Sequence, residues 1–321
     1  MKIKNLYNME AVKAFLDSGK QQGFADAYAG TVLARNLTAV DPTLFEKKFP
    51  ELAFVNSGIV ANNTGGYARR IQSLRIKELG GFKTAGDTSG NKGKISISAE
   101  DSYLNVLVRE GESDWSDDEI KEGELQNINL PERYLKAHNS LYMREVDEIG
   151  LIGITGGPDT GLLNHAGFTS GAAAGAVDTL AAQDLYDEFA DLINAQWAAV
   201  NNTPEYKANR VMTPVYVVNK MQSTMMNTAA GSSSVLRALQ DNFPDVQIIG
   251  TPRADDAVSA GVSATVAYSN NGESMIMRIP VPLTVGEILK VSSFHFHVES
   301  KYRIAGLDVL ENTAGRILTG L

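Results

Sequence analysis

Residues 150–167 read GLIGITGGPDTGLLNHAG, and the rest of the chain is arranged on either side of them. Six of these eighteen positions are glycine, and Pro158 with Asp159 adds a turn signal. A backbone this free to turn is typical of a joint between two bodies or of a loop that cradles a ligand. The stretch lacks the preceding strand and the Gly-Lys-Ser/Thr ending of a phosphate-binding loop, so the sequence favours a joint.

Length and composition indicate a globular protein of two compact bodies. The chain has 321 residues, 43% of them apolar, and a net charge of -9. The negative charge disfavours nucleic acid or an anionic membrane as the main partner of the whole surface, because it repels both. The chain contains no cysteine, which excludes disulfides and thiolate metal sites. No window approaches the ~18 apolar residues of a membrane span, and the N-terminus lacks a signal-peptide core, so we expect a soluble protein without a membrane partner.

Residues 1–59 are expected to form an N-terminal arm that contains helix but little core of its own. Helical spacing extends over residues 9–16, and Asp41 with Pro42 interrupts the segment. The apolar anchors that follow are scattered: Leu44, Phe45, Phe49, Leu52 and Phe54. Such an arm packs on another surface, and spacing alone leaves open whether that surface belongs to the same subunit or to a neighbour.

Residues 67–79 and 95–108 have the composition of strands, and the Gly/Lys-rich residues 80–93 separate them. This pattern predicts a long hairpin with a flexible tip. Residues 68–94 carry seven basic and two acidic side chains, whereas residues 100–124 carry ten acidic and two basic ones. Exposed ion pairs contribute only ~0–1 kcal/mol each, so this charge pattern would add little to the stability of one subunit. It is better suited to guiding the encounter of identical subunits and fixing their register.

The expected subunit interface combines these basic and acidic residues. Its members are Arg69, Arg70, Lys77, Lys83, Lys92, Lys94, Asp114, Asp117 and Asp118. A nucleotide site at the hairpin tip is disfavoured, because Gly93 and Lys94 are followed by Ile95, and the upstream glycine that a P-loop needs is missing.

Two long helices flank the glycine-rich stretch. The first is expected to begin near Pro131, just after Asn129, and to run for about five turns. Its apolar face comprises Tyr134, Leu135, Leu141, Tyr142, Val146 and Ile149, and its opposite face Glu132, Lys136, Asn139, Arg144 and Asp147. The apolar face of the second comprises Val177, Leu180, Ala181, Phe189, Leu192, Ile193, Trp197 and Val200.

From residue 211 onward the pattern alternates between strand and helix. We expect a buried strand over 215–218, an amphipathic helix over 232–243 capped by a serine of 232–234, and a second strand over 246–250. Asn271-Gly272 predicts a hairpin between strands at 262–268 and 275–279. Pro280 and Pro282 then end one body, residues 290–303 form a long alternating strand, and residues 307–310 and 317–318 close the fold.

One motif suggests a different class of function. His295, His297 and Glu299 alternate along a predicted strand and would share one face, as metal ligands do in cupin-like barrels. The match to that pattern is partial, because the spacing to the Glu, the upstream glycine and the distal histidine all differ. A solvent-exposed strand face is therefore favoured over a metal site. We predict no catalytic residue, no metal and no cofactor, and keep a metal-dependent β-barrel enzyme as the alternative.

The order of these parts resembles the major capsid proteins of tailed bacteriophages, whose fold is the Hong Kong 97 type and is shared with encapsulin cages. In the run after the long helix, the similar positions are Glu145, Gly150, Gly161, Leu162, Leu163 and Asn164. In the closing segment, Arg303, Gly306 and Val309 match the family pattern. Asn312 and Thr313 stand where proline is common, and Ala314, Gly315 and Arg316 replace a simpler Ala-Ile pair.

The resemblance implies an α+β fold with an N-terminal arm (1–59), an extended E-loop hairpin (60–112), a peripheral (P) domain with a long spine helix (113–160 and 281–302) and an α/β axial (A) domain (161–280 and 303–321). The joint would lie between the P and A domains. Its glycines would allow bending between lattice positions; they are Gly150, Gly153, Gly156, Gly157 and Gly161.

The implied function is self-assembly, through hexamers and pentamers, into the icosahedral head of a tailed phage that encloses double-stranded DNA by weak non-specific contact. Only about sixty residues precede the hairpin, so the scaffold is expected to be a separate protein, alongside a portal and decoration proteins. Assembly would occur in the bacterial cytoplasm and end in the virion. We predict no crosslink through Lys83, Lys92 or Lys94, and an encapsulin-like nanocompartment is the nearest rival.

Overall fold

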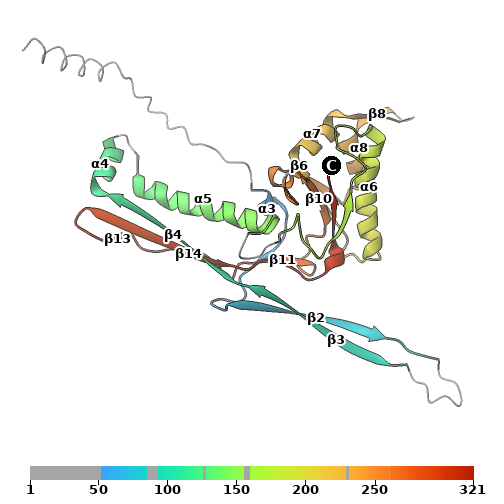
Figure 1. Ribbon diagram of the computed structural model, residues 1–321, viewed down its shortest axis with the longest axis horizontal. Coiled ribbons are helices and arrows are strands. Elements are labelled where there is room, and N and C mark those ends of the chain that lie inside the picture. The colour runs from blue at the N-terminus through green and yellow to red at the C-terminus, as the bar shows by residue number, and fades with distance from the viewer. Residues whose placement is uncertain (1–51, 85–92, 126–127, 155–159, 229–230, 260) are drawn as a thin grey trace, which may run out of the picture. The chain divides into compact units, whose positions relative to one another are not determined.

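The computed structural model of the chain describes residues 52–84, 93–125, 128–154, 160–228, 231–259 and 261–321. The helix expected over 9–16 and most of the arm therefore lie outside the described residues, as do Lys92, Gly156 and Gly157. The described part of the chain combines helices with five separate β-sheets (Figure 1). None of the described helices combines the length and the apolar composition that crossing a membrane requires.

The predicted hairpin is confirmed. Strand β2 (Arg70–Gly80) pairs with β3 (Ile95–Asn105) in antiparallel register along all eleven residues. Residues 107–116, however, do not extend the hairpin or link it to the next body. They form strand β4 (Leu107–Ser116), which pairs over its whole length with β14 (His295–Ile304). The acidic segment, residues 100–124, therefore comprises the end of β3, strand β4 and most of the short helix α4 (Asp117–Leu125).

Strand β14 is the centre of a second sheet. It pairs with β4 on one side and with β12 (Val281–Val285) and β13 (Leu289–Lys290) on the other. The single strand expected over 290–303 is instead divided, because the chain turns back through residues 291–294 and places Leu289 opposite His297. The turn makes β13 and β14 a short hairpin.

The long helix α5 (Leu130–Leu151) begins as predicted. Asn129 caps it, with its side chain accepting a hydrogen bond from the Glu132 amide, and Pro131 lies in the first turn. The predicted faces are partly wrong. Leu135 and Leu141 are exposed, whereas Asp147 is buried, because its carboxylate accepts the Phe54 amide and pairs with Arg253. Those partners lie far away in the sequence, so spacing could not reveal them.

Helix α5 lies along β4 and β14 and contacts them at its two ends and through polar bridges between (Figure 1). At the N-terminal end, Tyr134 stacks on Trp115 with ring centroids 5.0 Å apart, and Phe296 of β14 also stacks on Trp115, at 6.5 Å. At the C-terminal end, Val146, Ile149 and Leu151 enter the main core.

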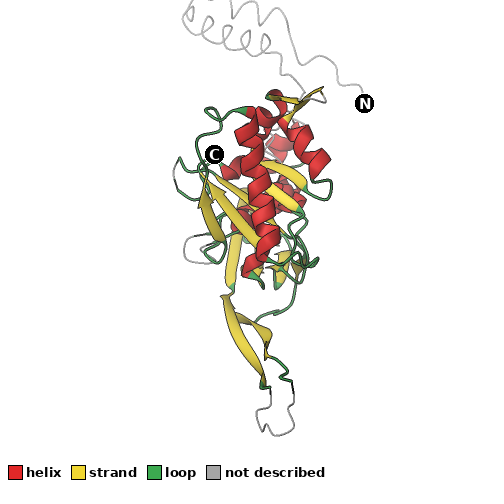
Figure 2. Ribbon diagram, turned by 90° about the vertical axis from the view of Figure 1, so that its right-hand side faces the viewer, coloured by secondary structure: helices red, strands yellow, loops and turns green. Residues whose placement is uncertain are grey.

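A five-stranded sheet with strand order β5-β16-β10-β6-β9 organises the C-terminal half. Its strands are β5 (Thr169–Ala172), β6 (Arg210–Pro214), β9 (Gln247–Thr251), β10 (Ala264–Tyr268) and β16 (Gly315–Thr319). One face packs on the core that contains the end of α5, and the other packs on helices α6 (Ala182–Ala199), α7 (Val215–Ser223) and α8 (Val235–Asn242). Figure 2 shows this helical layer over the strands. The two faces alternate along β10, where Val266 and Ala267 enter different cores.

Helix α8 with its Ser234 cap and strand β9 confirm part of the predicted alternation. Helix α6 confirms the second long helix, but its predicted extent is wrong, because Val177, Leu180 and Ala181 precede the helix and Val200 follows it. The strand predicted over 215–218 is wrong. Those residues begin α7, and the strand is β6, immediately before them. A valine-rich run fits a strand by composition, but here Val217 and Met221 lie one helical turn apart and are both buried.

The hairpin predicted at Asn271-Gly272 is also wrong. Strand β10 already has β6 and β16 on its two edges, so β11 (Met275–Arg278) cannot pair with it. Strand β11 pairs instead with β1 (Ala61–Asn62) and β15 (Gly306–Val309) in a separate sheet. The remaining short elements are α3 (Ala53–Asn56), β7 (Met225–Thr228), β8 (Gly231–Ser234) and the 3₁₀ turns η1 (Pro252–Ala254) and η2 (Asn312–Ala314).

Candidate assembly surface

The two faces of the β2–β3 hairpin differ in character. Residues directly opposite in an antiparallel pair share a face, and alternate residues along a strand lie on opposite faces. The register therefore places the even-numbered residues of β2 and the odd-numbered residues of β3 on the same face of the hairpin. Five large apolar side chains on that face are between 56% and 72% exposed. We call them the apolar stripe: Leu74, Ile76, Ile95, Ile97 and Tyr103.

The opposite face of β2 anchors the hairpin. Ile71 and Ser73 are buried, and the Ser73 hydroxyl donates to the Asp308 carboxylate at 2.6 Å. Arg75 donates to the Val309 carbonyl of β15. Beyond Arg75, the strand residues 76–80 and 95–99 form no hydrogen bond outside the hairpin within the described part of the chain.

The basic residues predicted for the interface are dispersed over the hairpin. Arg69, Arg70, Lys83 and Lys94 are exposed. Lys77 pairs with Glu100 of the neighbouring strand at 3.2 Å, and the Arg70 guanidinium donates to Asn105. These two contacts hold hairpin residues to each other, and neither reaches β4 or α4.

The acidic members of the predicted interface lie on the second sheet and on α4. Asp117 pairs with Lys121 one helical turn away, and Asp118 is exposed. Asp114 is bonded to His297. Within one subunit, the contacts described for Arg70, Lys77, Asp114 and Asp117 therefore do not join the predicted basic set to the predicted acidic set.

The HFHVE motif does project alternate residues from β14, but His297 contacts carboxylates. Its Nδ1 is bonded to Asp114 and its Nε2 to Glu299 at 3.1 Å. The Asp114 carboxylate first, and Glu299 after it, raise the pKa of His297 above its ordinary value. Among the residues that the structure describes, no three His, Asp or Glu side chains are placed to hold a metal ion.

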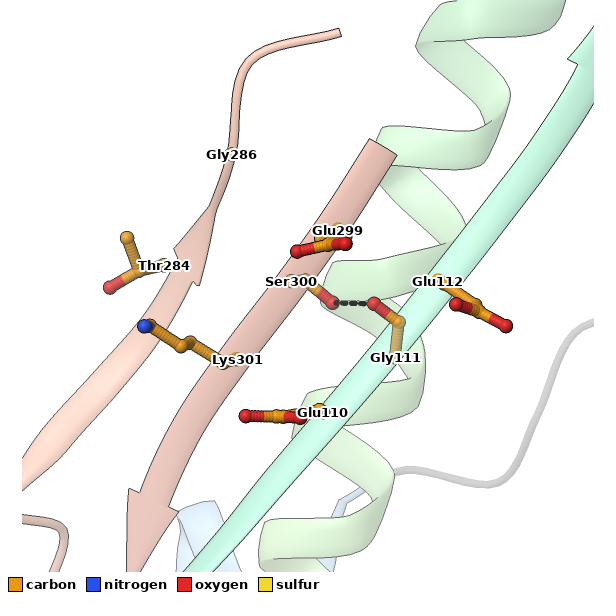
Figure 3. Close-up of a pocket in the computed structure, with 8 residues that line it drawn as sticks. All are labelled: Glu110, Gly111, Glu112, Thr284, Gly286, Glu299, Ser300 and Lys301. Carbon is orange, nitrogen blue, oxygen red and sulfur yellow. Dashed lines mark hydrogen bonds between the residues drawn. The ribbon is translucent and has the colours of Figure 1, made fainter. Parts of the chain in front are cut away.

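Two cavities lie on either side of β4 and β14. One of about 510 Å³ is lined by Glu110 and Glu112 of β4, by Glu299 and Lys301 of β14, and by Thr284 of β12 (Figure 3). Ser300 in this region donates to the Gly111 carbonyl at 3.3 Å. The other cavity, of about 530 Å³, lies against α5.

His138 bridges α5 to both strands beside this second cavity. Its Nε2 is 2.9 Å from the Ser113 hydroxyl, and its Nδ1 is 2.8 Å from the Ser300 hydroxyl. Glu145, one of the residues similar to the capsid family, makes a comparable bridge to Arg109 of β4 and Tyr302 of β14. Burial is the main cause that raises the pKa of the Tyr302 hydroxyl, which stays protonated.

The glycine-rich stretch is closed at its base. The amides of Leu162 and Leu163 donate to the carbonyls of Gly150 and Leu151 at 2.9 and 2.8 Å. Asn164 accepts from the Gly161 amide and donates to the Ile152 carbonyl. These bonds satisfy carbonyls at the end of α5 that have no partner within the helix.

The glycines at this base serve different purposes. Gly150 belongs to α5, and a Cβ there would lie 2.5 Å from the Phe54 ring. A Cβ on Gly161 would lie 2.3 Å from the Leu151 carbonyl carbon. Gly153 has a φ of 89°, which favours glycine. Close packing therefore accounts for Gly150 and Gly161, and a turn accounts for Gly153.

Sequence reasoning missed the apolar stripe because it weighed the charges of the hairpin. The signal was present in the alternation of Leu74 with Ile76 and of Ile95 with Ile97. In a two-stranded ribbon, such an alternation must leave one apolar face without a partner unless another element covers it.

Comparisons with known proteins agree with this architecture. A family model described as major capsid protein matches residues 93–321. The capsid of Myoviridae phage XM1 is 45% identical over 90% of this chain and 98% of that chain, with a TM-score of 0.81. The capsid of a native GTA particle is 16% identical with a TM-score of 0.65, and it covers 90% of this chain and 98% of its own.

A third similar structure, from Microbacterium phage Oxtober96, is 14% identical with a TM-score of 0.63, covering 90% of this chain and 97% of that chain. At such identities the similarity concerns the fold. A comparison with curated proteins finds no match.

Proposed function

Because this chain belongs to the major capsid protein family and forms the shell of a phage head, we propose that its hairpin is an E-loop that covers a second copy of the chain in that shell. Its place is the virion and its role is structural. The encapsulin-like cage and the metal-dependent enzyme are not favoured.

The observation that carries the proposal is the apolar stripe. A two-stranded hairpin is at best marginally stable alone in water, and large exposed apolar patches mark surfaces that bind other proteins. All five stripe residues lie on the face opposite the hairpin's own anchor, and within the described part of the chain they are exposed. A second copy is the partner that a shell of repeated subunits always provides.

We extend the proposal to the division of the chain. Residues 1–59 serve as the arm, 60–112 as the E-loop, 113–160 with 281–302 as the P domain, and 161–280 with 303–321 as the A domain. The sheet built on β14 supports the assignment of the P domain, and the five-stranded sheet supports that of the A domain. Arg69, Arg70, Lys77, Lys83, Lys92 and Lys94 would guide the hairpin toward acidic residues of the neighbour, Asp114, Asp117 and Asp118 among them.

The other partners follow from the same role. A separate scaffolding protein, a portal and decoration proteins would assemble with the shell in the bacterial cytoplasm. Double-stranded DNA would be enclosed with only weak contact, since a protein of net charge -9 repels phosphate. No catalytic step is proposed for any residue.

The test compares the two faces of the hairpin. Ile76→Ser with Ile97→Ser removes the centre of the stripe, and Leu79→Ser changes an apolar residue of β2 that is 53% exposed on the other face. The free energy of unfolding of both variants should differ from that of the parent by no more than about 0.5 kcal/mol, as is usual for surface substitutions. Electron microscopy should show closed shells for the parent and for Leu79→Ser, and none for the stripe variant. Normal shells from the stripe variant would refute the docking proposal.

A further inference from the structure

The turn between β10 and β11 contains the one Asn-Gly pair of the sequence, Asn271-Gly272. It is held through the main-chain carbonyl of Asn271. This oxygen accepts the amides of Ser274 and Met275 at 2.9 and 3.1 Å, and also the Ser274 hydroxyl at 2.7 Å. Met275 begins β11 and is fully buried, so these bonds fix the start of a core strand.

These bonds leave the Gly272 amide without an acceptor among the contacts of the described residues. Gly272 is also open to its surroundings, because a Cβ built there would have no heavy atom within 4 Å. Both Asn271 and Gly272 are half-buried, so water reaches the turn. An unbonded amide that no side chain shields is a nucleophile available to the side chain before it.

The Asn271 side chain supplies the carbon that this nitrogen can attack. Its Oδ1 accepts the Glu273 amide at 3.3 Å, and a donor on this oxygen stabilises the negative charge that develops when the Cγ carbonyl is attacked. Its Nδ2 donates no hydrogen bond within the part of the chain that the structure describes, so nothing there holds the leaving group. The neighbouring Asn270 differs, because its Oδ1 is bonded to Asn209 at 2.6 Å and the next residue is not glycine.

We infer that Asn271 is a site of spontaneous deamidation, at which the turn slowly converts its own asparagine to isoaspartate. The Gly272 amide gives its proton to hydroxide, its nitrogen bonds to Cγ of Asn271, and Nδ2 leaves as ammonia after taking a proton from water. The product is a cyclic succinimide. Water then opens this ring at one of its two carbonyls and gives isoaspartate or aspartate. The site goes beyond the shell role and does not depend on which surface the hairpin covers.

Isoaspartate changes the geometry of the turn. The backbone then runs through the former side chain and gains a methylene group, and the main-chain carbonyl of residue 271 becomes part of a free carboxylate. That carbonyl is the acceptor for Ser274 and Met275, so the start of β11 loses the bonds that fix it. The new negative charge also lies two residues from Glu273. We therefore expect the modified chain to unfold more easily than the fresh one.

The experiment measures deamidation of the folded, full-length chain by peptide mapping. The parent and Gly272→Ala are incubated at pH 6 and pH 8, digested, and analysed by mass spectrometry with electron-transfer fragmentation, which separates aspartate from isoaspartate. Gly272→Ala is the matched variant, because its φ lies outside the left-handed region and its methyl group enters open space, so that it hinders only ring closure. Asn139 is the internal control: it is exposed and precedes a serine, but the Ser140 amide lies within α5. The parent unfolded in guanidinium chloride gives the rate without the turn.

We expect isoaspartate and aspartate at position 271 of the folded parent. They should form several-fold faster at pH 8 than at pH 6 and several-fold more slowly in Gly272→Ala, while Asn139 stays intact. The midpoint of urea unfolding should be lower for the aged parent than for equally aged Gly272→Ala.

An Asn271 that stays intact in the folded parent while it reacts in the unfolded chain would overturn the site, as would equal rates in the parent and in Gly272→Ala. If Gly272→Ala does not fold, as judged by circular dichroism, Asn271→Gln replaces it and should lose the isoaspartate that an isoaspartate-specific methyltransferase labels; undiminished label would overturn the site as well. Shell formation by fresh protein is scored separately, so failure of this site is distinguishable from failure of the docking proposal.

Discussion

Phe54 packs so closely on Gly150 that a Cβ at position 150 would lie 2.5 Å from its ring. Phe54 belongs to the short helix α3, Gly150 is the penultimate residue of α5, and the Phe54 amide donates to Asp147 in the same helical turn. The end of the long helix is thus the point at which α3 is attached to the main core.

Gly150→Ala should therefore destabilise the protein. The added methyl group has to displace an aromatic ring in a filled core, and overpacking of this kind costs ~1–3 kcal/mol. Urea unfolding followed by circular dichroism measures the change. Gly171→Ala, where a Cβ meets open space, is the control and should unfold like the parent.

A second measurement combines Phe54→Leu with Gly150→Ala. A smaller side chain leaves room for the methyl group, so the double variant should lose less stability than the sum of the two single variants. If Gly150→Ala is as stable as Gly171→Ala, the close contact does not constrain this position, and bending would be the better account of the glycine.

Local patterns predicted those elements whose boundaries depend on neighbouring residues. Asn129 and Pro131 set the start of α5, Ser234 caps α8, and alternation marks the hairpin. The valines of α7 were assigned to a strand because composition does not separate a short buried helix from a strand.

Most features of the candidate site depend on contacts between distant residues. Ser73 and Asp308 are 235 positions apart, and the burial of Asp147 depends on Phe54 and Arg253, 93 and 106 positions away. Asn271-Gly272 has the local signature of a hairpin, but pairing was decided by the occupied edges of β10. Tertiary pairing overrode local propensity in each of these cases.

The stability of the folded protein should depend on pH through His297. Bonds from Asp114 and Glu299 favour the protonated ring and raise the pKa of His297. Its contribution to stability is therefore fully present below ~6.5, the ordinary value, and is lost as the pH rises through the raised pKa of the folded protein. A proton–nitrogen NMR titration of the unassembled chain measures this pKa.

Asp114→Asn should lower the measured pKa of His297 toward ~6.5, and Glu299→Gln should lower it less. Both variants keep the size of the side chain, so a change in packing is not expected. A pKa at or below ~6.5 in the parent would show that the two carboxylates do not hold the proton on this ring.

Reversing the charge of the hairpin should block assembly without unfolding the subunit. In the variant Arg69→Glu, Arg70→Glu, Lys77→Glu, the only ion pair lost among the described contacts of these residues is Lys77 with Glu100, and an exposed pair contributes only ~0–1 kcal/mol. The reversed hairpin would instead repel the acidic side chains of β4 and α4 on a neighbouring copy. Electron microscopy and sedimentation should then show folded subunits and no shells, and Arg237→Glu on α8 should assemble normally.

Salt separates this electrostatic defect from the loss of the apolar stripe. At ~1 M salt the screening length falls to ~3 Å, so repulsion between reversed charges weakens and shells should partly return. The stripe variant should not be rescued, because burial of apolar surface does not depend on screening. Normal shells from the charge-reversed variant at low salt would show that the basic residues do not guide the hairpin, whereas a defect that persists at high salt would mean that they make close contacts rather than long-range ones.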